Sequence, residues 1–236
     1  MSSGKVPVLS GVAETSTAAA CRFAETASKN GANGFMLLPG MQYAADPRET
    51  MHHFRTVAAC TNLPIMLYNN PVAYRIDVTP EMFAELADEP KFIALKESSD
   101  DVRRITDIRR LVGERYAIFT GVDDLALESF VLGAVGWVAG LVCAFPKETV
   151  ALYKLATAGR MDEALTLYRW FTPLLHLDVS TKFVQNIKLA EAIVGRGTEH
   201  VRAPRLPLTG SERAAVEKTV RAALETRPTQ IGRAHV

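Results

Sequence analysis

The sequence contains few cysteines, and those it has are far apart. Cys21, Cys60 and Cys143 form no CxxC pair within the 236 residues. This spacing argues against a disulfide framework or a zinc site built from cysteines, and it indicates a reducing cytoplasm. Free cysteines of this kind are usually buried, so we expect all three to pack in the core.

The sequence also lacks an excess of charge and any long apolar run. The formal net charge is +1, which provides no basic surface for nucleic acid or an anionic membrane. No segment approaches the roughly 18 uninterrupted apolar residues of a membrane helix. The start, MSSGKVPVLSG, has too short an apolar run for a signal peptide. We therefore expect a cytoplasmic protein with neither nucleic acid nor membrane as a partner.

Glycine-rich phosphate loops and metal-ligand clusters are missing as well. The segments GANG and GVDDLALE do not have the GxGxxG or GxxxxGK[ST] spacing, which disfavours a nucleotide site. His52 and His53 are adjacent, so on a helix they point about 100° apart and cannot clasp one metal ion. We expect both on the surface of that helix, and we expect no metal and no organic cofactor.

Short apolar runs alternate with helical patterns through the first part of the chain. None of these runs alternates cleanly between apolar and polar residues, which is typical of parallel strands buried on both faces. Alternation of such strands with helices predicts a parallel sheet with right-handed crossovers. The predicted strands lie in residues 6–12, 34–40, 64–70, 92–98, 116–122 and 136–142.

Beyond residue 145 the pattern is helical. Residues 146–159, 160–176, 180–195 and 209–226 carry stripes of leucine, alanine and valine. From the pattern alone two α/β folds remain open, a doubly wound sheet and a (β/α) barrel, and both place functional residues at the carboxyl ends of the strands.

Two reactive residues fall at such strand ends. Tyr68 ends the run PIMLYNN, and Lys96 ends the next run, FIALKES. Neighbouring parallel strands lie about 4.8 Å apart, so the two side chains could meet. Burial favours the neutral amine of a lysine, which attacks a ketone or imine carbon to form a Schiff base, and a nearby tyrosine hydroxyl can shuttle protons. The simpler alternatives are that Lys96 pairs with Glu97 or an aspartate, and that Tyr68 is a hydrogen-bonded core residue.

The segments YNNP, ALKESS and FTGVDD together resemble the dihydrodipicolinate synthase / N-acetylneuraminate lyase family. The resemblance extends over nearly the whole chain. It implies a class I, Schiff-base-forming lyase with an α/β TIM (β/α)8-type barrel and extra C-terminal helices. It also implies that VPVLSGV is the third barrel strand, so we expect a barrel that lacks its first two βα units. Residues 1–145 would then be an incomplete barrel of six parallel strands, and residues 146–236 the last barrel helix and the C-terminal helical region.

The resemblance assigns roles to particular residues. Lys96 corresponds to the Schiff-base lysine and Tyr68 to its proton-relay tyrosine. Gly121 and Val138 correspond to substrate-pocket positions, and Tyr43 lies near a tyrosine that can reach the site of a neighbouring subunit. Synthases of the family have an arginine at the position of Ala73, and this departure disfavours dihydrodipicolinate synthesis.

Within the family, YNNPVAY, ALKESSDD, WVAGLVCAFP and STKFVQNIKLAEA most resemble 1-pyrroline-4-hydroxy-2-carboxylate deaminases of hydroxyproline degradation. The implied substrate is a small 2-keto acid or cyclic imino acid, and the implied assembly is a homo-oligomer, either dimer or tetramer. Alternative functions are dihydrodipicolinate synthase and 2-keto-3-deoxy sugar acid lyase or dehydratase. An inactive fragment that serves as a binding or assembly module is the alternative outside enzymes.

Overall fold

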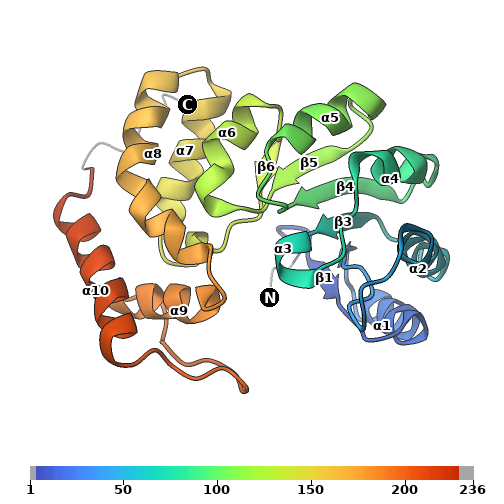
Figure 1. The fold of residues 1–236 in the computed structure, drawn as a ribbon, viewed down its shortest axis with the longest axis horizontal. Helices are drawn as coiled ribbons and strands as arrows, with labels where there is room; N and C mark the ends of the chain where they lie inside the picture. The colour runs from blue at the N-terminus through green and yellow to red at the C-terminus, as the bar shows by residue number, and fades with distance from the viewer. Residues whose placement is uncertain (1–3, 229–236) are drawn as a thin grey trace. The chain divides into compact units, whose positions relative to one another are not determined.

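The computed structural model describes residues 4–228, and its central element is a six-stranded sheet with the strand order β1-β2-β3-β4-β5-β6 (Figure 1). Sequence neighbours are therefore also neighbours in the sheet, and the first four strands pair in parallel register. This confirms the predicted α/β fold of six parallel strands, the arrangement found in TIM-type barrels. The strands are β1 (Leu9–Val12), β2 (Gly34–Leu37), β3 (Ile65–Asn69), β4 (Phe92–Glu97), β5 (Ala117–Thr120) and β6 (Gly136–Trp137).

Helices connect these strands and continue after the last one. Those between strands are α1 (Thr17–Lys29), α2 (Pro47–Ala59), α3 (Pro71–Tyr74), α4 (Pro80–Glu85), α5 (Arg103–Val112) and α6 (Ala126–Val131). Those that follow β6 are α7 (Pro146–Thr157), α8 (Met161–Leu175), α9 (Phe183–Ile193) and α10 (Gly210–Glu225). All predicted strands and helices are thus present, and none of them extends beyond the residue range predicted for it.

Local sequence signals explain where several helices begin. The side chain of Asp46 accepts a hydrogen bond from the backbone N–H of Glu49, and the Glu49 carboxylate accepts one from the N–H of Asp46, a reciprocal capping box at α2. At α4 the cap is one-sided: the hydroxyl of Thr79 accepts a hydrogen bond of 3.4 Å from the N–H of Met82, and Pro80 stands at the first helical position. These caps satisfy N–H groups that have no partner within the helix.

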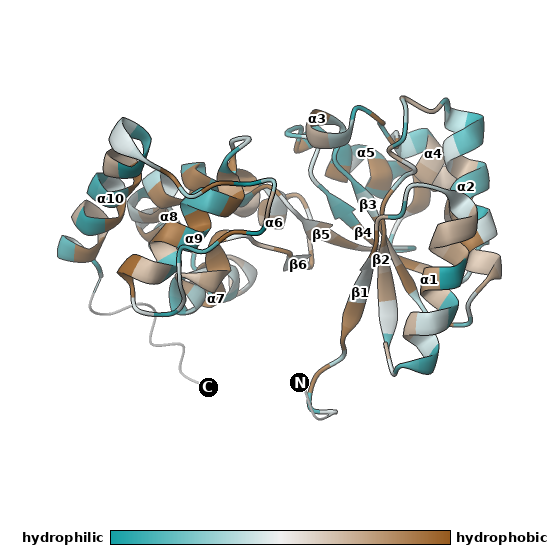
Figure 2. Cartoon of the chain, turned by 90° about the horizontal axis from the view of Figure 1, so that it is seen from below, coloured by the Kyte–Doolittle hydropathy of each residue, from teal (hydrophilic) through white to brown (hydrophobic). Residues whose placement is uncertain are grey.

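The chain divides into two compact units. One unit extends to Phe119 and includes Leu132–Val135, and the other contains Thr120–Val131 and the chain from Gly136 onward. In the first unit, α1 and α2 carry hydrophilic and hydrophobic residues along their length, as Figure 2 shows. The apolar residues of this unit pack on the sheet, and its largest fully buried side chains include Phe35, Phe54, Phe83, Phe92 and Tyr116.

The second unit has a helical core of its own. Apolar side chains, most of them leucine, from the segment between α6 and α10 form one buried cluster, which includes Leu127, Phe145, Leu152, Phe171, Leu174, Leu189 and Val220. Burial of apolar area of this extent is the main stabilising contribution to such a unit.

A buried aspartate fixes the segment that follows β6. Asp123 is fully buried, and its carboxylate accepts hydrogen bonds from the indole Nε1 of Trp137 at 2.9 Å and from the backbone N–H groups of Gly140 and Leu141 at 3.1 and 2.8 Å. A buried carboxylate needs several such donors because it has lost its hydration. Asp123 therefore connects the end of β5 to the loop after β6.

Two expectations about burial are wrong. His53 is 6% exposed rather than on the surface, and its Nδ1 lies 2.9 Å from the hydroxyl of Thr17. Burial lowers the pKa of His53 below its ordinary value. Cys143 is exposed, and Cys21 and Cys60 are half-buried, so the cysteines do not lie fully in the core. In residues 4–228 no helix is both long and apolar enough to cross a membrane.

We predict that Asp123→Asn lowers the free energy of unfolding by about 2 to 3 kcal/mol, because the new amide group faces an N–H donor and leaves it unpaired. Urea denaturation measures this value. Asp107→Asn, on an exposed position of α5, is the control and should change it by less than about 0.5 kcal/mol. Equal effects of the two substitutions would contradict the anchoring role of Asp123.

Candidate active site

The register of β3 and β4 determines the candidate site. Tyr68 pairs with Lys96 and Asn69 pairs with Glu97 across the two parallel strands. Successive side chains of a strand point to opposite faces of a sheet. Tyr68 and Lys96 therefore share one face at the carboxyl end of the sheet, and Asn69 and Glu97 share the other.

Tyr68 and Lys96 are in contact. The Nζ atom of Lys96 lies 4.2 Å from the centroid of the Tyr68 ring, within the range of a cation–π interaction. Tyr68 is 8% exposed, and Lys96 is half-buried. Among the residues that the structure describes, Lys96 forms no ion pair. The simpler alternative, an ion pair of Lys96 with Glu97 or an aspartate, is therefore absent from residues 4–228. The structure thus brings together the two residues that the sequence analysis selected, while their catalytic roles stay a prediction.

The hydroxyl of Tyr68 has polar neighbours on the loop after β3. The side-chain Nδ2 of Asn70 donates a hydrogen bond of 3.1 Å to this hydroxyl. Tyr74, the last residue of α3, packs edge-on against the Tyr68 ring with 5.7 Å between ring centroids. The loop after β3 therefore contacts both the hydroxyl and the ring of Tyr68.

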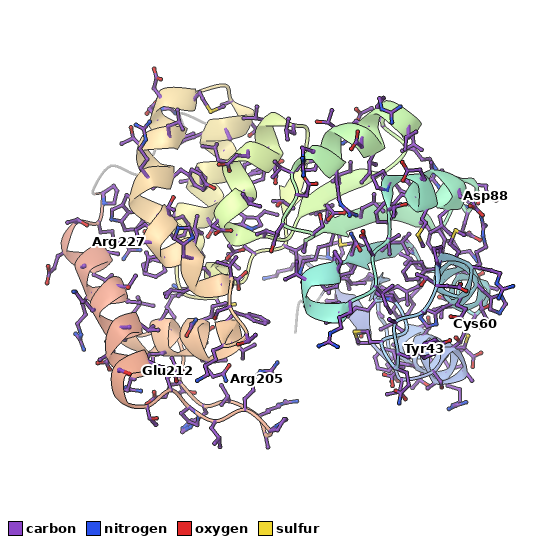
Figure 3. The ribbon with its side chains drawn as sticks, in the orientation of Figure 1. Tyr43, Cys60, Asp88, Arg205, Glu212 and Arg227 are labelled. Atoms are coloured by element: carbon purple, nitrogen blue, oxygen red, sulfur yellow. The ribbon has the colours of Figure 1, made fainter. Side chains whose placement is uncertain are left out.

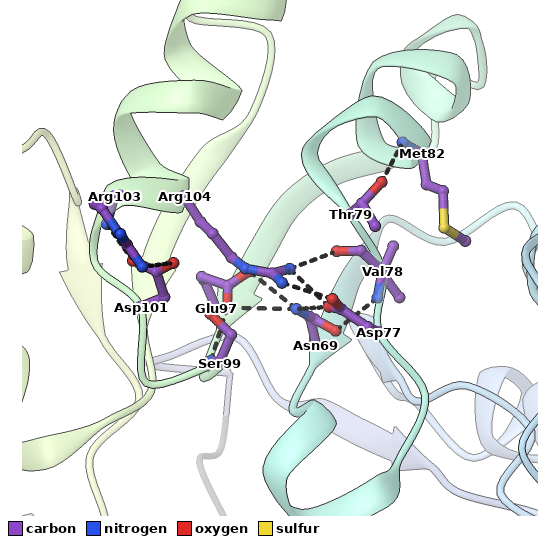
Figure 4. A network of polar contacts seen from close by, with 10 residues as sticks. All are labelled: Asn69, Asp77, Val78, Thr79, Met82, Glu97, Ser99, Asp101, Arg103 and Arg104. Carbon is purple, nitrogen blue, oxygen red and sulfur yellow. Dashed lines mark hydrogen bonds and ion pairs between the residues drawn. The ribbon is translucent and has the colours of Figure 1, made fainter.

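The opposite face of the same strands carries a buried polar network, drawn in Figure 4. The Nδ2 of Asn69 donates to the Glu97 carboxylate at 3.2 Å, and the N–H of Ser99 donates to it at 2.8 Å. The side-chain Oδ1 of Asn69 accepts a hydrogen bond of 2.9 Å from the N–H of Val78. These bonds connect the ends of β3 and β4 directly behind Tyr68 and Lys96.

An ion pair extends this network to α5. Arg104 donates from both terminal nitrogens to the two carboxylate oxygens of Asp77, each at 2.6 Å. Asp77 also lies 3.4 Å from the Nδ2 of Asn69. Because Arg104 donates these hydrogen bonds to the Asp77 carboxylate, the pKa of Arg104 is raised above its usual value. Bidentate pairs of this kind fix geometry as well as charge, so the loop from Asn70 to Val78 is anchored at its far end.

Glu97 is the most unusual ionisable group near the site. It is 5% exposed, and burial raises its pKa above the ordinary value, while the hydrogen bonds from Ser99 and Asn69 act in the opposite direction. Carboxyl groups whose charged form is disfavoured by burial cluster at functional sites, although structural networks contain them as well.

The remaining predicted site residues lie elsewhere. Tyr43 is 61% exposed on the loop before α2, where Figure 3 labels it. The pKa of Tyr43 is raised above its ordinary value, mainly by a hydrogen bond with Glu49. Gly121 follows β5 and Val138 follows β6, both in the second unit, and the N–H of Val138 donates to the carbonyl of Thr120 at 2.9 Å. Their roles as pocket residues stay predictions.

The sequence assigned no role to several residues near Tyr68 and Lys96. Asn69, Asp77, Glu97 and Arg104 form the network behind the reactive pair, and the hydroxyl of Ser98 is buried without a hydrogen-bond partner in the described part of the chain. The two-residue period of a strand could have located two of them. Asn69 and Glu97 directly follow Tyr68 and Lys96, so their side chains point to the opposite face of the sheet. Within residues 4–228 no group of three histidine, cysteine or acidic residues could hold a metal ion.

A parallel strand–helix fold with a lysine at the end of one strand and a tyrosine beside it on the next is the arrangement of Schiff-base lyases with TIM-type barrels. The chain belongs to the dihydrodipicolinate synthetase family, whose model matches residues 1–223. As a member of this family it is a lyase of the class I aldolase type.

Individual relatives agree with this assignment. The 4-hydroxy-tetrahydrodipicolinate synthase of Desulforamulus reducens is 30% identical over 210 residues, which cover 89% of this chain and 71% of the relative. The solved 4-hydroxy-tetrahydrodipicolinate synthase of Methylacidiphilum fumariolicum SolV superposes with a TM-score of 0.89 at 27% identity, covering 95% of this chain and 75% of that one. YagE of Escherichia coli K12, solved in complex with pyruvate, gives a TM-score of 0.87 at 25% identity, with 94% and 77% covered.

We predict that Glu97 makes stability depend on pH. Its raised folded pKa means that the folded chain binds this proton more tightly than the unfolded chain, so the stability due to Glu97 is fully present below its ordinary value of 4.5 and is lost as pH rises through the folded pKa. The Glu97→Gln variant should therefore gain stability relative to the unchanged chain as pH increases from 4.5.

Urea denaturation of both chains across this range measures the difference. Glu163→Gln is a suitable control, because hydrogen bonding to Arg160 lowers the pKa of Glu163 and its contribution is constant above pH 4.5. A difference for Glu97→Gln that is equally flat with pH would contradict the prediction.

Proposed function

We propose that Lys96 forms a Schiff base with a small 2-keto acid or cyclic imino acid, and that Tyr68 transfers the protons this chemistry requires. The observation that carries the proposal is the contact of Lys96 Nζ with the Tyr68 ring at 4.2 Å, at the paired ends of two neighbouring parallel strands. Lys96 is half-buried at this strand end, and a lysine amine in its neutral form is the nucleophile of Schiff-base chemistry.

The proposed reaction begins when the Lys96 amine attacks the carbon of a C=O or C=N bond. Water or the ring amine is displaced, and a protonated Schiff base forms. This group accepts an electron pair, so a neighbouring C–H or C–O bond can break. The Tyr68 hydroxyl both donates and accepts hydrogen bonds, which suits it to carry the proton to and from the substrate.

The substrate that the sequence motifs favour is 1-pyrroline-4-hydroxy-2-carboxylate. Deamination of this imino acid would eliminate the ring hydroxyl as water, and two water molecules would then hydrolyse its bonds to nitrogen. The products would be ammonia and 2-oxoglutarate semialdehyde, with a net uptake of one water. Ala73 supports this choice over a synthase, because it stands where the synthases of the family have an arginine for a substrate carboxylate. The side chain of Arg75, two residues on, is exposed, and its backbone has a φ of 61° at the end of α3.

A second candidate is 4-hydroxy-tetrahydrodipicolinate synthesis, which is favoured by the names of relatives such as that of Exiguobacterium sp., 30% identical over 222 residues. A 2-keto-3-deoxy sugar acid lyase or dehydratase uses the same Schiff base. A chain that gives no Lys96 adduct with any keto or imino acid would instead support a binding or assembly module.

The proposal also includes a homo-oligomer in the cytoplasm. Tyr43 would reach the site of a second copy, which its high exposure permits, and Gly121 and Val138 would line the substrate pocket. Neither a metal ion nor an organic cofactor has a part in the proposed chemistry.

We predict that borohydride traps pyruvate or the imino acid on Lys96, as detected by peptide mass spectrometry. Lys96→Ala should abolish the adduct, and Lys96→Arg should do so too, because a guanidinium group stays protonated. Tyr68→Phe should still permit trapping but lower turnover by roughly 10²–10⁴-fold, the usual contribution of a positioned acid–base group.

Lys182→Ala is the matched control, since the Lys182 ammonium forms an ion pair with Glu212 on the surface and should not react. Adducts on Lys182 or Lys188, together with full activity of Lys96→Ala, would show that another lysine is the nucleophile. Comparison of trapping yields for pyruvate and for the imino acid separates the candidate substrates.

A further inference from the structure

Two of the three cysteines come together at one backbone carbonyl between α1 and α2. Cys60, labelled in Figure 3, caps the end of α2, and its Sγ donates a hydrogen bond of 3.3 Å to the carbonyl of Thr56. The Sγ of Cys21, on α1, donates to the same carbonyl from the other helix at 3.8 Å. The two sulfur atoms therefore lie no farther apart than these two distances combined, although the cysteines are far apart in the sequence.

The two helices that carry these cysteines are held together on both sides of them. Figure 1 shows α1 and α2 side by side in the first unit, and their residues are in contact. The hydroxyl of Thr17 lies 2.9 Å from the Nδ1 of His53, and the hydroxyls of Ser28 and Thr61 lie 3.4 Å apart. In each segment the cysteine stands between these two contacts, so the sulfur atoms stay close as long as both contacts last.

Both thiols are within reach of small molecules from solvent. Cys21 and Cys60 are half-buried, so neither is enclosed in the core. Burial raises the pKa of the Cys21 thiol to about 11, so little of it is thiolate at neutral pH. Cys21 therefore suits a second, intramolecular step, in which the sulfur atom that it attacks already lies beside it.

We propose that Cys21 and Cys60 form a redox-sensitive dithiol, which a small-molecule disulfide converts into an intramolecular disulfide between α1 and α2. The proposal rests on the shared carbonyl and on the two flanking contacts. It involves no residue of the candidate active site and is independent of the proposed function. Disulfides in a reducing compartment are usually transient or redox-sensing, so this bond would act as a switch and not as a permanent support.

The oxidant is the small disulfide, and the reaction consists of two exchange steps. The Cys60 thiolate attacks one sulfur of that disulfide, its S–S bond breaks, and a mixed disulfide and one small thiolate result. The Cys21 thiolate then attacks the Cys60 sulfur, forms the protein disulfide and expels the second small thiolate. Each cysteine sulfur loses one electron, the small disulfide gains two, and the two protons of the protein thiols end on the two small thiols.

The new bond would close a ring of the chain from Cys21 to Cys60. This ring contains β2, the loop with Tyr43 and all of α2. A cross-link of this kind lowers the entropy of the unfolded chain and so stabilises the folded one, provided that the bond is free of strain. Oxidation should therefore be visible as an increase in thermal stability.

Disulfide mapping tests the proposal on the unchanged chain. The protein is incubated with oxidised glutathione, the free thiols are alkylated, and its peptides are analysed by mass spectrometry without reduction. We expect a peptide pair that joins Cys21 to Cys60 within one chain, and dithiothreitol should restore both thiols. Cys143, which is exposed and lies in the second unit, should carry only a glutathione adduct.

Serine variants separate the two steps. In Cys21→Ser the second step is impossible, so the glutathione adduct on Cys60 should accumulate about tenfold more than in the unchanged chain. Cys143→Ser is the matched control and should form the same link as the unchanged chain. Oxidation should raise the Tm of Cys143→Ser by about 5 °C, the order of magnitude for a cross-link of this kind, and should not raise that of Cys21→Ser.

Glutathione adducts on both Cys21 and Cys60 without a linked peptide would overturn the proposal. So would a link that appears only between two copies of the chain on a denaturing gel, or an equal amount of Cys60 adduct in Cys21→Ser and in the unchanged chain. The mapping needs no substitution, so it decides the question even if a serine variant folds poorly.

Discussion

The pairing of β3 with β4 is the constraint on which the candidate site depends. Backbone hydrogen bonds set Tyr68 opposite Lys96 and Asn69 opposite Glu97. Because side chains alternate between the faces of a sheet, a shift of one residue would move Tyr68 to the face of Glu97 and break both pairs together. The Nζ of Lys96 lies 4.2 Å from the centroid of the Tyr68 ring because the paired strands carry the two side chains, and within residues 4–228 neither side chain forms an ion pair.

The same register provides a second, buried layer behind the reactive pair. Asn69 and Glu97 are 0% and 5% exposed, and every hydrogen bond they form is with the backbone or with a residue of this network. Buried polar groups cost free energy unless their partners are well placed, so such a network stabilises one arrangement of the strand ends. Through Asp77 and Arg104 that arrangement extends to the loop that carries Tyr74.

Sequence patterns were informative where short-range physics decides the outcome. Asp46 and Thr79 are caps of a kind that the sequence reveals directly, since a side-chain cap depends only on neighbouring N–H groups. The sequence failed where packing from distant segments decides. His53 is buried because Thr17, on another helix, lies against it, and Cys143 is exposed although cysteines are usually buried. The packing around His53 and Cys143 depends on segments far away in the sequence, so the residues adjacent to them in the chain do not predict it.

The sequence by itself determined the parallel α/β class, the six strands and the position of Lys96 and Tyr68 at two strand ends, because these follow from local periodicity and from motifs. Only the tertiary structure decided that their side chains meet, that the amide of Asn69 reaches the carboxylate of Glu97, and that Tyr74 packs against Tyr68. Those relations join residues of different strands and loops. Their distances depend on strand register and on loop anchoring by Asp77 and Arg104, which no local pattern encodes.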